Sequence, residues 1–404
     1  MIQYAHMIHR KRNGSIYRAF EIAKKSMRSC YGDRGILAGR RHFNDYWARD
    51  GFLASLGSLK LGDMETVRQH IKLFCNTQAQ NGQIAVRYGS KDNTFIKKLK
   101  NILHVPMSSV NVPSYLVDRL FKWESNTPCD SNSLFIICCA EYLKQSGDKK
   151  FIKSVERYID RAASWLQSQM KNGLYEEKPY AGFYDSVKKE GHSLYANVLL
   201  YKAFASLKYI QTSLSHQKKS KTFHMFANKL RKNISETFYT GTHFLDWIKD
   251  KKTYSHFTTD GNLFAIWFGL ATPTQTSSIL DVVKNTRLAH PVPCRTNTPS
   301  YPKHLMYPPL FLIGMGDYHN NSLGWLWLGS LYALCLYKHG LKRLAQNILK
   351  KIADLIVKHD QIYEVYDKSA NPVKRFFYTA ESPFALSAAF FALAVRTIFP
   401  QGEK

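Results

Sequence analysis

The chain has 404 residues, of which 45% are hydrophobic and 22% are charged, so it carries enough apolar material for a large packed core. Lysine and arginine total 57 against 30 acidic residues, which gives a formal net charge of +27. These basic residues are scattered as pairs along polar helix faces, and no nucleic-acid-binding module is recognisable, which argues against a nucleic-acid partner. The longest apolar segment, 323–337, is too short to span a bilayer, so no membrane partner is expected.

The seven cysteines include no C-x-x-C spacing, which argues against a disulfide framework or a zinc ribbon. Together with a first segment whose charges follow a short apolar patch, the reverse of a signal peptide, this predicts a reduced, cytoplasmic protein. The 15 histidines show no metal-ligand spacing, and neither a nucleophile elbow nor a phosphate-binding glycine loop is present. We therefore expect no metal and no cofactor.

Hydrophobic spacing predicts a series of helices in chain order, the first over about 15–28. Helical hairpins then follow over about 50–61 and on to 80, 130–143 and 151–170, 192–210 and 217–238, 260–271 and 273–285, and 322–339 and 341–359. A final helix is predicted over about 383–398. Glycines and prolines break the pattern over residues 81–128, which predicts a long loop region over the face of the site.

The first helices of the pairs recur with a period of roughly 60 to 80 residues and are apolar on most sides, whereas the second helices are amphipathic and rich in lysine. This contrast predicts six buried inner helices ringed by six exposed outer ones, with the N-terminal helix closing the outer ring. The expected fold class is all-α, a single-domain (α/α)6 toroid over residues 1–404. An open solenoid of helical hairpins has the same periodicity, so closure is an inference.

In such a toroid the loops before the inner helices open on one face, so polar residues from distant parts of the chain converge there. The organising stretch is Tyr46-Trp47-Ala48-Arg49-Asp50-Gly51, which crowds aromatic rings, an arginine and a carboxylate at a helix start. The alternative is an ordinary helix start, with Asp50 as the N-cap residue and Arg49 as a surface partner. The same face is expected to collect Asp130, His192, Asp260, His319, and the segment from Glu364 to Glu381.

Two carboxylates lie among aromatic residues, Asp185 in the segment 182–186 and Glu364 in the segment 362–367. An apolar setting raises the pKa of a carboxyl group, as a general acid requires, and a second carboxylate across a gap can activate water. This arrangement is typical of glycoside hydrolysis. The alternative is that Asp185 is a turn residue and Glu364 a solvated charge. The 24 Tyr, 24 Phe and 7 Trp suit either stacking on sugar rings or a bulky core.

These motifs resemble the six-hairpin glycosidases, which include glucoamylases, the amylo-1,6-glucosidase part of glycogen debranching enzymes, and the alkaline and neutral invertases. The resemblance rests on the 46–51 stretch, on Asp130-Ser131, on the run 261–273, and on Glu364-Val365-Tyr366-Asp367 and Glu381-Ser382-Pro383. Ser186 follows Asp185 where glucoamylases have a second acidic residue, which favours the debranching-type or invertase-type members.

The resemblance implies that Asp185 is the general acid and Glu364 the base of an inverting hydrolysis, with Glu381 as the competing candidate for the base. Substrate contacts would come from Tyr46, Trp47, Arg49, Asp50, Asp130, His192, Asp260, His319, Trp325 and Glu381, and the two tryptophans would supply stacking surface. We therefore expect a carbohydrate substrate and hydrolysis of a glucosidic bond in an α-glucan or gluco-oligosaccharide. The alternative function is a catalytically silent helical toroid that binds a polyanion or a protein through its basic surface.

Overall fold

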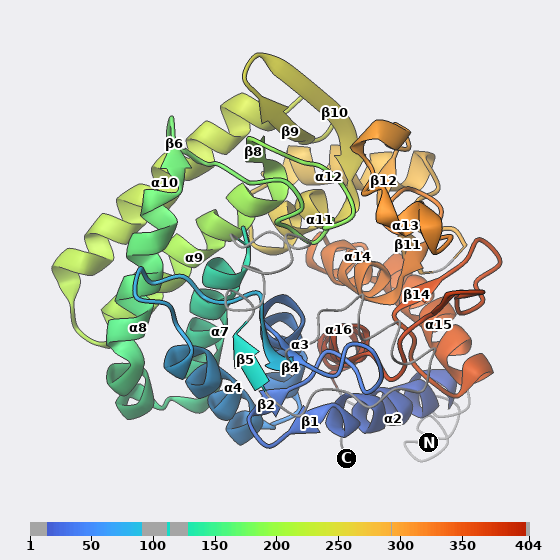
Figure 1. Ribbon diagram of the computed structural model, residues 1–404, viewed down its shortest axis with the longest axis horizontal. Helices are drawn as coiled ribbons and strands as arrows, with labels where there is room; N and C mark the ends of the chain where they lie inside the picture. Colours follow the sequence, from blue (N-terminus) through green and yellow to red (C-terminus); the bar gives the residue numbers. More distant parts are fainter. Residues whose placement is uncertain (1–13, 91–110, 114–127, 292, 401–404) are drawn as a thin grey trace, which may run out of the picture.

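The structure is a computed structural model that describes residues 14–90, 111–113, 128–291 and 293–400. Helices of an inner ring surround its centre, as Figure 1 shows. Each inner helix packs against the next, and the last packs back against the first. In chain order they are α3 (Ala48–Lys60), α7 (Ser131–Ser146), α9 (Leu194–Ser213), α11 (Thr259–Trp267), α14 (Leu326–Lys338) and α16 (Ala385–Ile398). The ring is closed, which confirms the toroid and excludes an open solenoid.

Closure of the ring depends on a close approach between α16 and α3. A Cβ atom added at Gly57 would lie 2.4 Å from the carbonyl oxygen of Ala389, so only glycine allows the two backbones to meet at this distance. The first and last inner helices therefore close the ring by packing directly against each other.

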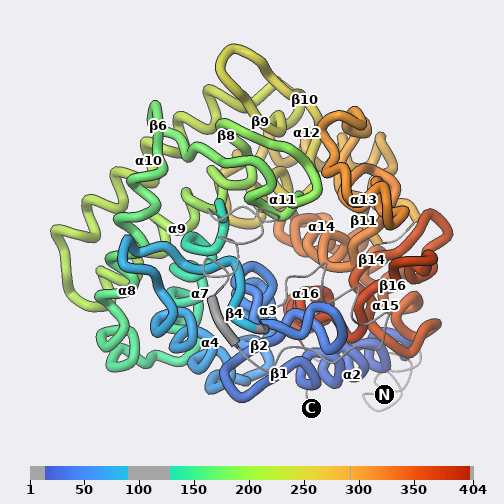
Figure 2. Tube along the Cα trace, viewed as in Figure 1, coloured from blue at the N-terminus to red at the C-terminus, as the bar shows by residue number. Residues whose placement is uncertain are grey.

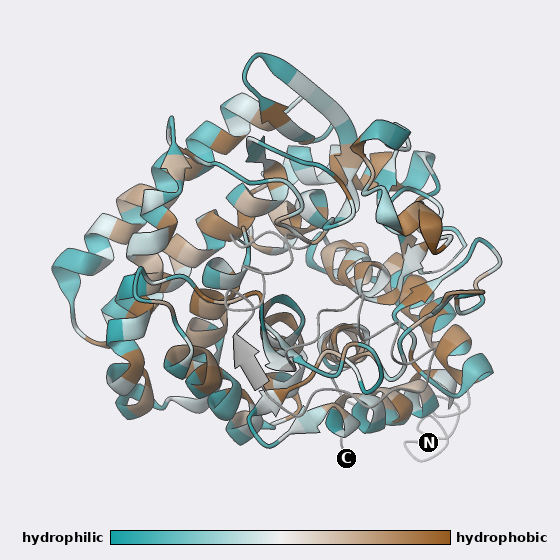
Figure 3. Ribbon diagram, in the orientation of Figure 1, coloured by the Kyte–Doolittle hydropathy of each residue, from teal (hydrophilic) through white to brown (hydrophobic). Residues whose placement is uncertain are grey.

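Outer helices cover the inner ring, and their order is clear in the tube of Figure 2. They are α2 (Gly14–Ser29), α4 (Met64–Asn76), α8 (Lys149–Ser168), α10 (Gln217–Phe238), α12 (Pro273–Asn285) and α15 (Lys342–His359). Helix α2 packs against both α15 and α16 and so closes the outer ring, as predicted. Figure 3 shows hydrophilic residues along the outward turns of α8 and α10, as expected for helices with one buried face.

The bounds of α10 and α12 coincide with the sequence prediction, whereas several inner helices start elsewhere than predicted. Short strands explain the difference, because an inner helix often begins directly after one. Strands β3 (Tyr46–Trp47), β8 (His192–Ser193), β10 (Lys252–Thr258) and β13 (Gly324–Trp325) end immediately before α3, α9, α11 and α14. The residue before each of these helices is therefore extended, with ψ angles of 128° at Trp47 and 119° at Trp325.

These strands pair with segments distant in the sequence. One sheet has the order β12 (Asn297–Thr298), β10, β9 (Leu245–Lys249), β8, and a second has the order β11 (Cys294–Arg295), β13, β14 (Val365–Tyr366). A third has the order β3, β4 (Arg87–Ser90), β5 (Asn111–Pro113). In register, Tyr46 faces Tyr88, His192 faces Ile248, and Trp325 faces Val365. The pairings hold the starts of the inner helices on one face. Two further antiparallel pairs are formed by β1 (Tyr31–Gly32) with β2 (Gly35–Ile36) and by β6 (Met170–Lys171) with β7 (Leu174–Tyr175).

A repeated hydrogen-bond pattern ties three inner helices to the segments outside them. Asn132, Asn197 and Asn262 are fully buried and evenly spaced in the sequence. Each side-chain amide accepts a hydrogen bond from one backbone N–H and donates one to a backbone carbonyl. For Asn132 these groups belong to Ile84 and Gly82. For Asn197 both belong to Tyr175, and for Asn262 both belong to Phe244. The internal repeat is therefore structural as well as hydrophobic.

The predicted loop region 81–128 falls largely on residues 91–110 and 114–127, which lie outside the described residues. Its place over the site therefore stays a prediction. Among the residues that the structure describes, no helix has the length and apolar character needed to cross a membrane.

Candidate active site

Arg49 joins three parts of the ring through one guanidinium group. Its Nε donates to Oδ2 of Asp130 at 2.5 Å, its Nη2 donates to the carbonyl of Gly182 at 2.8 Å, and its Nη1 lies 3.6 Å from Oδ2 of Asp185. The side chain is 11% exposed. The alternative of a surface partner is therefore wrong for Arg49, which holds α3, α7 and the Asp185 segment together.

Asp130 occupies the N-cap position of α7, yet its side chain makes no cap hydrogen bond. Its Oδ2 accepts from Arg49 and, at 3.1 Å, from the hydroxyl of Tyr195. Its buried Oδ1 has no hydrogen-bond partner among the described residues. Asp50 is not an N-cap residue either, because α3 begins at Ala48 and Asp50 lies in its first turn.

Asp185 differs in its setting from the sequence expectation. Its side chain is 47% exposed, and the groups beside it are Nη1 of Arg49 at 3.6 Å and Nδ1 of His319 at 3.7 Å. The flanking Phe183 and Tyr184 are buried, Phe183 against Trp325 and Trp327, and the hydroxyl of Tyr184 donates to the carbonyl of Thr296. This carboxylate is therefore partly open to solvent and lies beside a guanidinium group, whereas the sequence predicted an apolar setting.

His319 lies in a stack of rings behind Asp185. Its imidazole is nearly parallel to Trp325, with centroids 5.0 Å apart, and to Tyr184, with centroids 5.5 Å apart. Its Nδ1 is 2.8 Å from Oγ of Ser186. Burial lowers the pKa of His319 well below its ordinary value, so the ring is neutral. A neutral histidine thus supports the segment that carries Asp185.

Trp325 is 1% exposed and has His319 against its face. It therefore offers no free face for a sugar ring, contrary to the stacking role expected from the sequence. Trp47 is also buried, with its ring edge-on to Phe43 at 6.0 Å. Both tryptophans were predicted as ligand contacts because the sequence does not tell a buried ring at a helix start from an exposed one.

The segment that carries Asp185 is fastened on both sides. The N–H of Tyr307 donates to the carbonyl of Ser186, and the N–H of Lys188 donates to the carbonyl of Leu305. Farther along, Nζ of Lys189 donates to Oδ1 of Asp246 at 2.6 Å and lies 4.0 Å from the centre of the Tyr184 ring. Sequence reasoning missed this buried ion pair, because its partners are far apart in the chain and read as ordinary charges.

Burial raises the pKa of three carboxyl groups that lie near Lys189 or Arg49. Burial raises the pKa of Glu177 to about 7 and that of Asp260 to about 6, in each case against the opposing effect of Lys189. Burial likewise raises the pKa of Asp50 to about 6, against the attraction of Arg49. Ser193 donates a hydrogen bond to Glu177. Asp260 is 1% exposed, and its contact with a ligand stays a prediction.

Glu364 directly precedes β14 and is 1% exposed. The hydroxyl of Tyr318 donates to its Oε1, and the hydroxyl of Tyr378 donates to its Oε2 at 2.5 Å. The backbone N–H of Glu381 also donates to Oε2, at 3.2 Å. At least three donors among the described residues therefore orient its carboxylate. Sequence reasoning selected neither Tyr318 nor Tyr378, although it selected His319, the residue after Tyr318.

Glu381 is fully buried and accepts hydrogen bonds from the backbone of the loop 40–43. Its Oε1 accepts from the N–H groups of Arg40 and Arg41 at 2.9 and 2.7 Å, and its Oε2 accepts from the N–H of Phe43 at 3.2 Å. Nδ1 of His42 lies 3.1 Å from the same oxygen. These contacts involve both oxygens, so Glu381 anchors the 40–43 loop. Glu364 is likewise buried with both oxygens accepting hydrogen bonds, so the choice between the two as the base stays a prediction.

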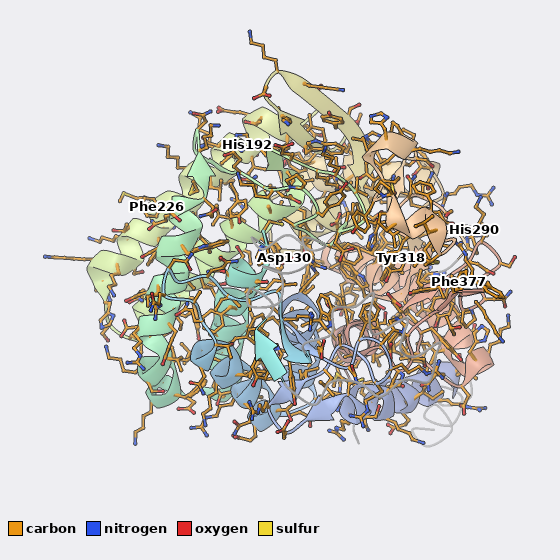
Figure 4. All side chains as sticks on the ribbon, in the orientation of Figure 1. Asp130, His192, Phe226, His290, Tyr318 and Phe377 are labelled. Atoms are coloured by element: carbon orange, nitrogen blue, oxygen red, sulfur yellow. The ribbon has the colours of Figure 1, made fainter. Side chains whose placement is uncertain are left out.

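Two further predicted residues lie away from these carboxylates. The hydroxyl of Tyr46 donates to Oδ1 of Asp33 at 2.6 Å, in the turn between β1 and β2. Nδ1 of His192 lies 2.9 Å from the carbonyl of Tyr175. In Figure 4 His192 lies towards the upper edge of the ring, whereas Asp130 and Tyr318 lie nearer its middle.

The two candidate catalytic carboxylates are linked through adjacent residues. Tyr318 donates to Glu364, and His319, the next residue, lies 3.7 Å from Asp185. Consecutive residues thus contact both groups. The structure brings together Arg49, Asp130, Asp185, His319 and Glu364 on one face of the ring, and it separates Tyr46 and His192 from them.

Comparison with known protein families decides the classification. The model of the bacterial alpha-L-rhamnosidase six-hairpin glycosidase domain matches residues 18–295, more than half of the chain. The chain belongs to this family. It is a glycoside hydrolase with the six-hairpin fold, which confirms the resemblance to six-hairpin glycosidases. No curated protein sequence matches the chain.

Solved structures agree with the six-hairpin fold. A glycosidase variant in complex with glucose superposes with a TM-score of 0.69 at 13% identity, over 95% of this chain and 98% of that one. A rhamnosidase from Klebsiella oxytoca with rhamnose bound has a TM-score of 0.67 at 12% identity, over 95% and 64%. The GH63 mannosylglycerate hydrolase from Thermus thermophilus, in complex with Tris, has a TM-score of 0.66 at 10% identity, over 93% and 99%. At these identities the similarity concerns the fold.

Proposed function

We propose that this glycosidase hydrolyses a glucosidic bond in an α-glucan or a short gluco-oligosaccharide, with inversion at the anomeric carbon. Asp185 is the general acid and Glu364 the general base. The observation that carries this proposal is the contact of the adjacent residues Tyr318 and His319 with both carboxylates. In an inverting hydrolysis one carboxyl group protonates the leaving oxygen while the other activates water on the opposite face of the sugar.

The settings of the two groups suit these roles. Glu364 is fixed by Tyr318, Tyr378 and a backbone N–H, so it is oriented before water arrives. Asp185 is about half exposed and can meet a glycosidic oxygen that enters from solvent. Arg49, 3.6 Å from Asp185, is placed to hold that carboxylate and a hydroxyl group of the sugar together.

Glucose is the proposed sugar, supported by the debranching-type Asp185-Ser186 pattern and by the structural neighbour that binds glucose and matches this chain over almost its full length. Rhamnose is the second candidate, because the matching family is described by alpha-L-rhamnosidase activity. A silent toroid that binds a polyanion remains the alternative outside hydrolysis.

Sugar release tests the proposal on sucrose, trehalose, maltose, isomalto-oligosaccharides, glycogen, limit dextrin and an aryl α-L-rhamnoside. We expect glucose from at least one α-glucoside. Asp185→Asn should lower that turnover by about 10²- to 10⁴-fold, the usual contribution of a general acid. The control is Asp281→Asn, an exposed aspartate of α12, which should keep the parental rate. Parental turnover by Asp185→Asn, or release of rhamnose alone, would contradict the proposal.

A further inference from the structure

Two neighbouring segments of the site face leave four large apolar side chains in water. Phe311 and Leu312, which end α13 (Pro309–Leu312), are 43% and 81% exposed. Phe376 and Phe377, the turn between β15 (Lys374–Arg375) and β16 (Tyr378–Thr379), are 92% and 44% exposed. We call these four residues the apolar rim. Helix α13 is strongly hydrophobic in Figure 3, and Figure 4 shows Phe377 outward of Tyr318.

The apolar rim is held in place rather than exposed on a loose loop. Arg375 forms an ion pair with both oxygens of Asp317, at 2.6 and 2.9 Å, and also donates to the carbonyl of Gly314. These contacts join the β15–β16 turn to the loop that follows α13. The rings of Phe376 and Phe377 meet edge to face, with centroids 4.5 Å apart. A fixed cluster of exposed apolar groups is costly in water and marks an interaction surface.

The apolar rim borders the candidate active site. Tyr378, which holds Glu364, directly follows Phe377, and Asp317, which anchors the turn, directly precedes Tyr318. On the other side, the segment before α13 hydrogen-bonds to Ser186, next to Asp185. Whatever covers the rim therefore lies at the edge of the site.

Exposed cations accompany the apolar rim. Lys374 precedes it in the β15–β16 hairpin, and Lys368 lies shortly before that hairpin. Lys303 is exposed ahead of α13. Arg40 and Arg41 are also exposed. Their loop is bound by Glu381, which lies two residues after the end of β16. These cations belong to a chain whose formal net charge is +27. The face thus combines a few projecting apolar groups with positive charge.

We propose that the apolar rim docks on the surface of an anionic phospholipid bilayer. The Phe and Leu side chains enter the boundary between headgroups and acyl chains, while the surrounding lysines and arginines meet lipid phosphates. Charge complementarity selects this partner, because a second copy would bring the same +27 charge and repel. Such peripheral contact requires no spanning helix, and it revises the sequence expectation of no membrane partner.

Vesicle co-sedimentation of the full chain tests this proposal without reference to the sugar. The probes are vesicles of phosphatidylcholine alone and of equal parts phosphatidylcholine and phosphatidylglycerol. The rim variant is Leu312→Ser with Phe376→Ser. The control is Met225→Ser, which changes a residue that is 61% exposed on the outer helix α10. All of these positions are exposed, so circular dichroism and Tm should be unchanged.

We expect the parental chain to pellet with the anionic vesicles and not with the neutral ones, and to be released by high salt. The rim variant should bind at least about tenfold more weakly, and Met225→Ser should bind like the parent, because only the rim groups enter the bilayer. Equal binding by parent and rim variant, or no preference for anionic vesicles, would overturn the proposal. So would two other results for the rim variant: loss of self-association, which would point to a second copy, or loss of turnover on a soluble glucoside, which would make the rim a substrate subsite.

Discussion

The two sides of the site hold their carboxylates in different ways. Asp185 is 47% exposed, and nitrogens of Arg49 and His319 lie 3.6 and 3.7 Å from its carboxylate oxygens. Glu364 is 1% exposed and accepts from Tyr318, Tyr378 and a backbone N–H. One carboxyl group is therefore partly open to solvent, and the other is buried among hydrogen-bond donors. This asymmetry is what an acid and a base on opposite sides of a sugar require.

The largest expected effect is a difference between Asp185 and Glu364 variants in how their rates depend on the leaving group. Aryl α-glucosides of increasingly acidic phenols need less protonation as the bond breaks, so Asp185→Asn should recover towards the parental rate along the series. Glu364→Gln removes the base that every substrate needs, so it should stay about 10³-fold or more below the parent throughout. The measurement is kcat/KM against the pKa of the phenol. Parallel lines for the two variants would remove the distinction between the sides.

Glu381→Gln is the matched control within the Glu364 side. An amide in place of this carboxylate sets an NH₂ group against the N–H donors of the 40–43 loop, which should cost about 1–3 kcal/mol of stability. We expect a lower Tm and an unchanged dependence on leaving group. A loss of turnover equal to that of Glu364→Gln at an unchanged Tm would make Glu381 the base.

A smaller effect concerns Glu177, a buried carboxyl group near Lys189. The folded pKa of Glu177 is raised from 4.5 to about 7, so its favourable contribution is present below pH 4.5 and is lost as the pH rises to 7. Glu177→Gln mimics the protonated group at every pH. Its unfolding free energy should therefore match the parent near pH 4.5 and exceed it by up to about 3 kcal/mol at pH 8. Denaturant titrations at both pH values measure the difference, and a gap independent of pH would show that Glu177 does not titrate in this range.

The ring of helices was predictable because inner and outer helices differ in their local pattern of hydrophobic residues. Inner helices such as α9 and α14 are buried on almost every side, whereas outer helices carry one apolar face, and this contrast survives without any tertiary information. The strands were not predictable. A two-residue strand such as Gly324–Trp325 shows no alternation, and it exists only because Val365 and Cys294, distant in the sequence, pair with it.

At the site, residue type was easier to predict than orientation. Arg49, Asp130, His319 and Glu364 were placed on one face by the topology of inner-helix starts. The buried positions of Trp325 and Glu381 depend on contacts with His319 and with the 40–43 backbone, which no local pattern reports. Lys189 was missed for the same reason, since its partner Asp246 lies on a strand that the sequence did not reveal.

The stereochemistry of the first product tests the central claim most directly. If Asp185 and Glu364 act on opposite faces of the sugar, proton NMR of an α-glucoside digest should show β-glucose first, with the α-anomer appearing only by later mutarotation. If α-glucose appeared first, the reaction would proceed with retention, and the pairing of Asp185 as acid with Glu364 as base would be contradicted.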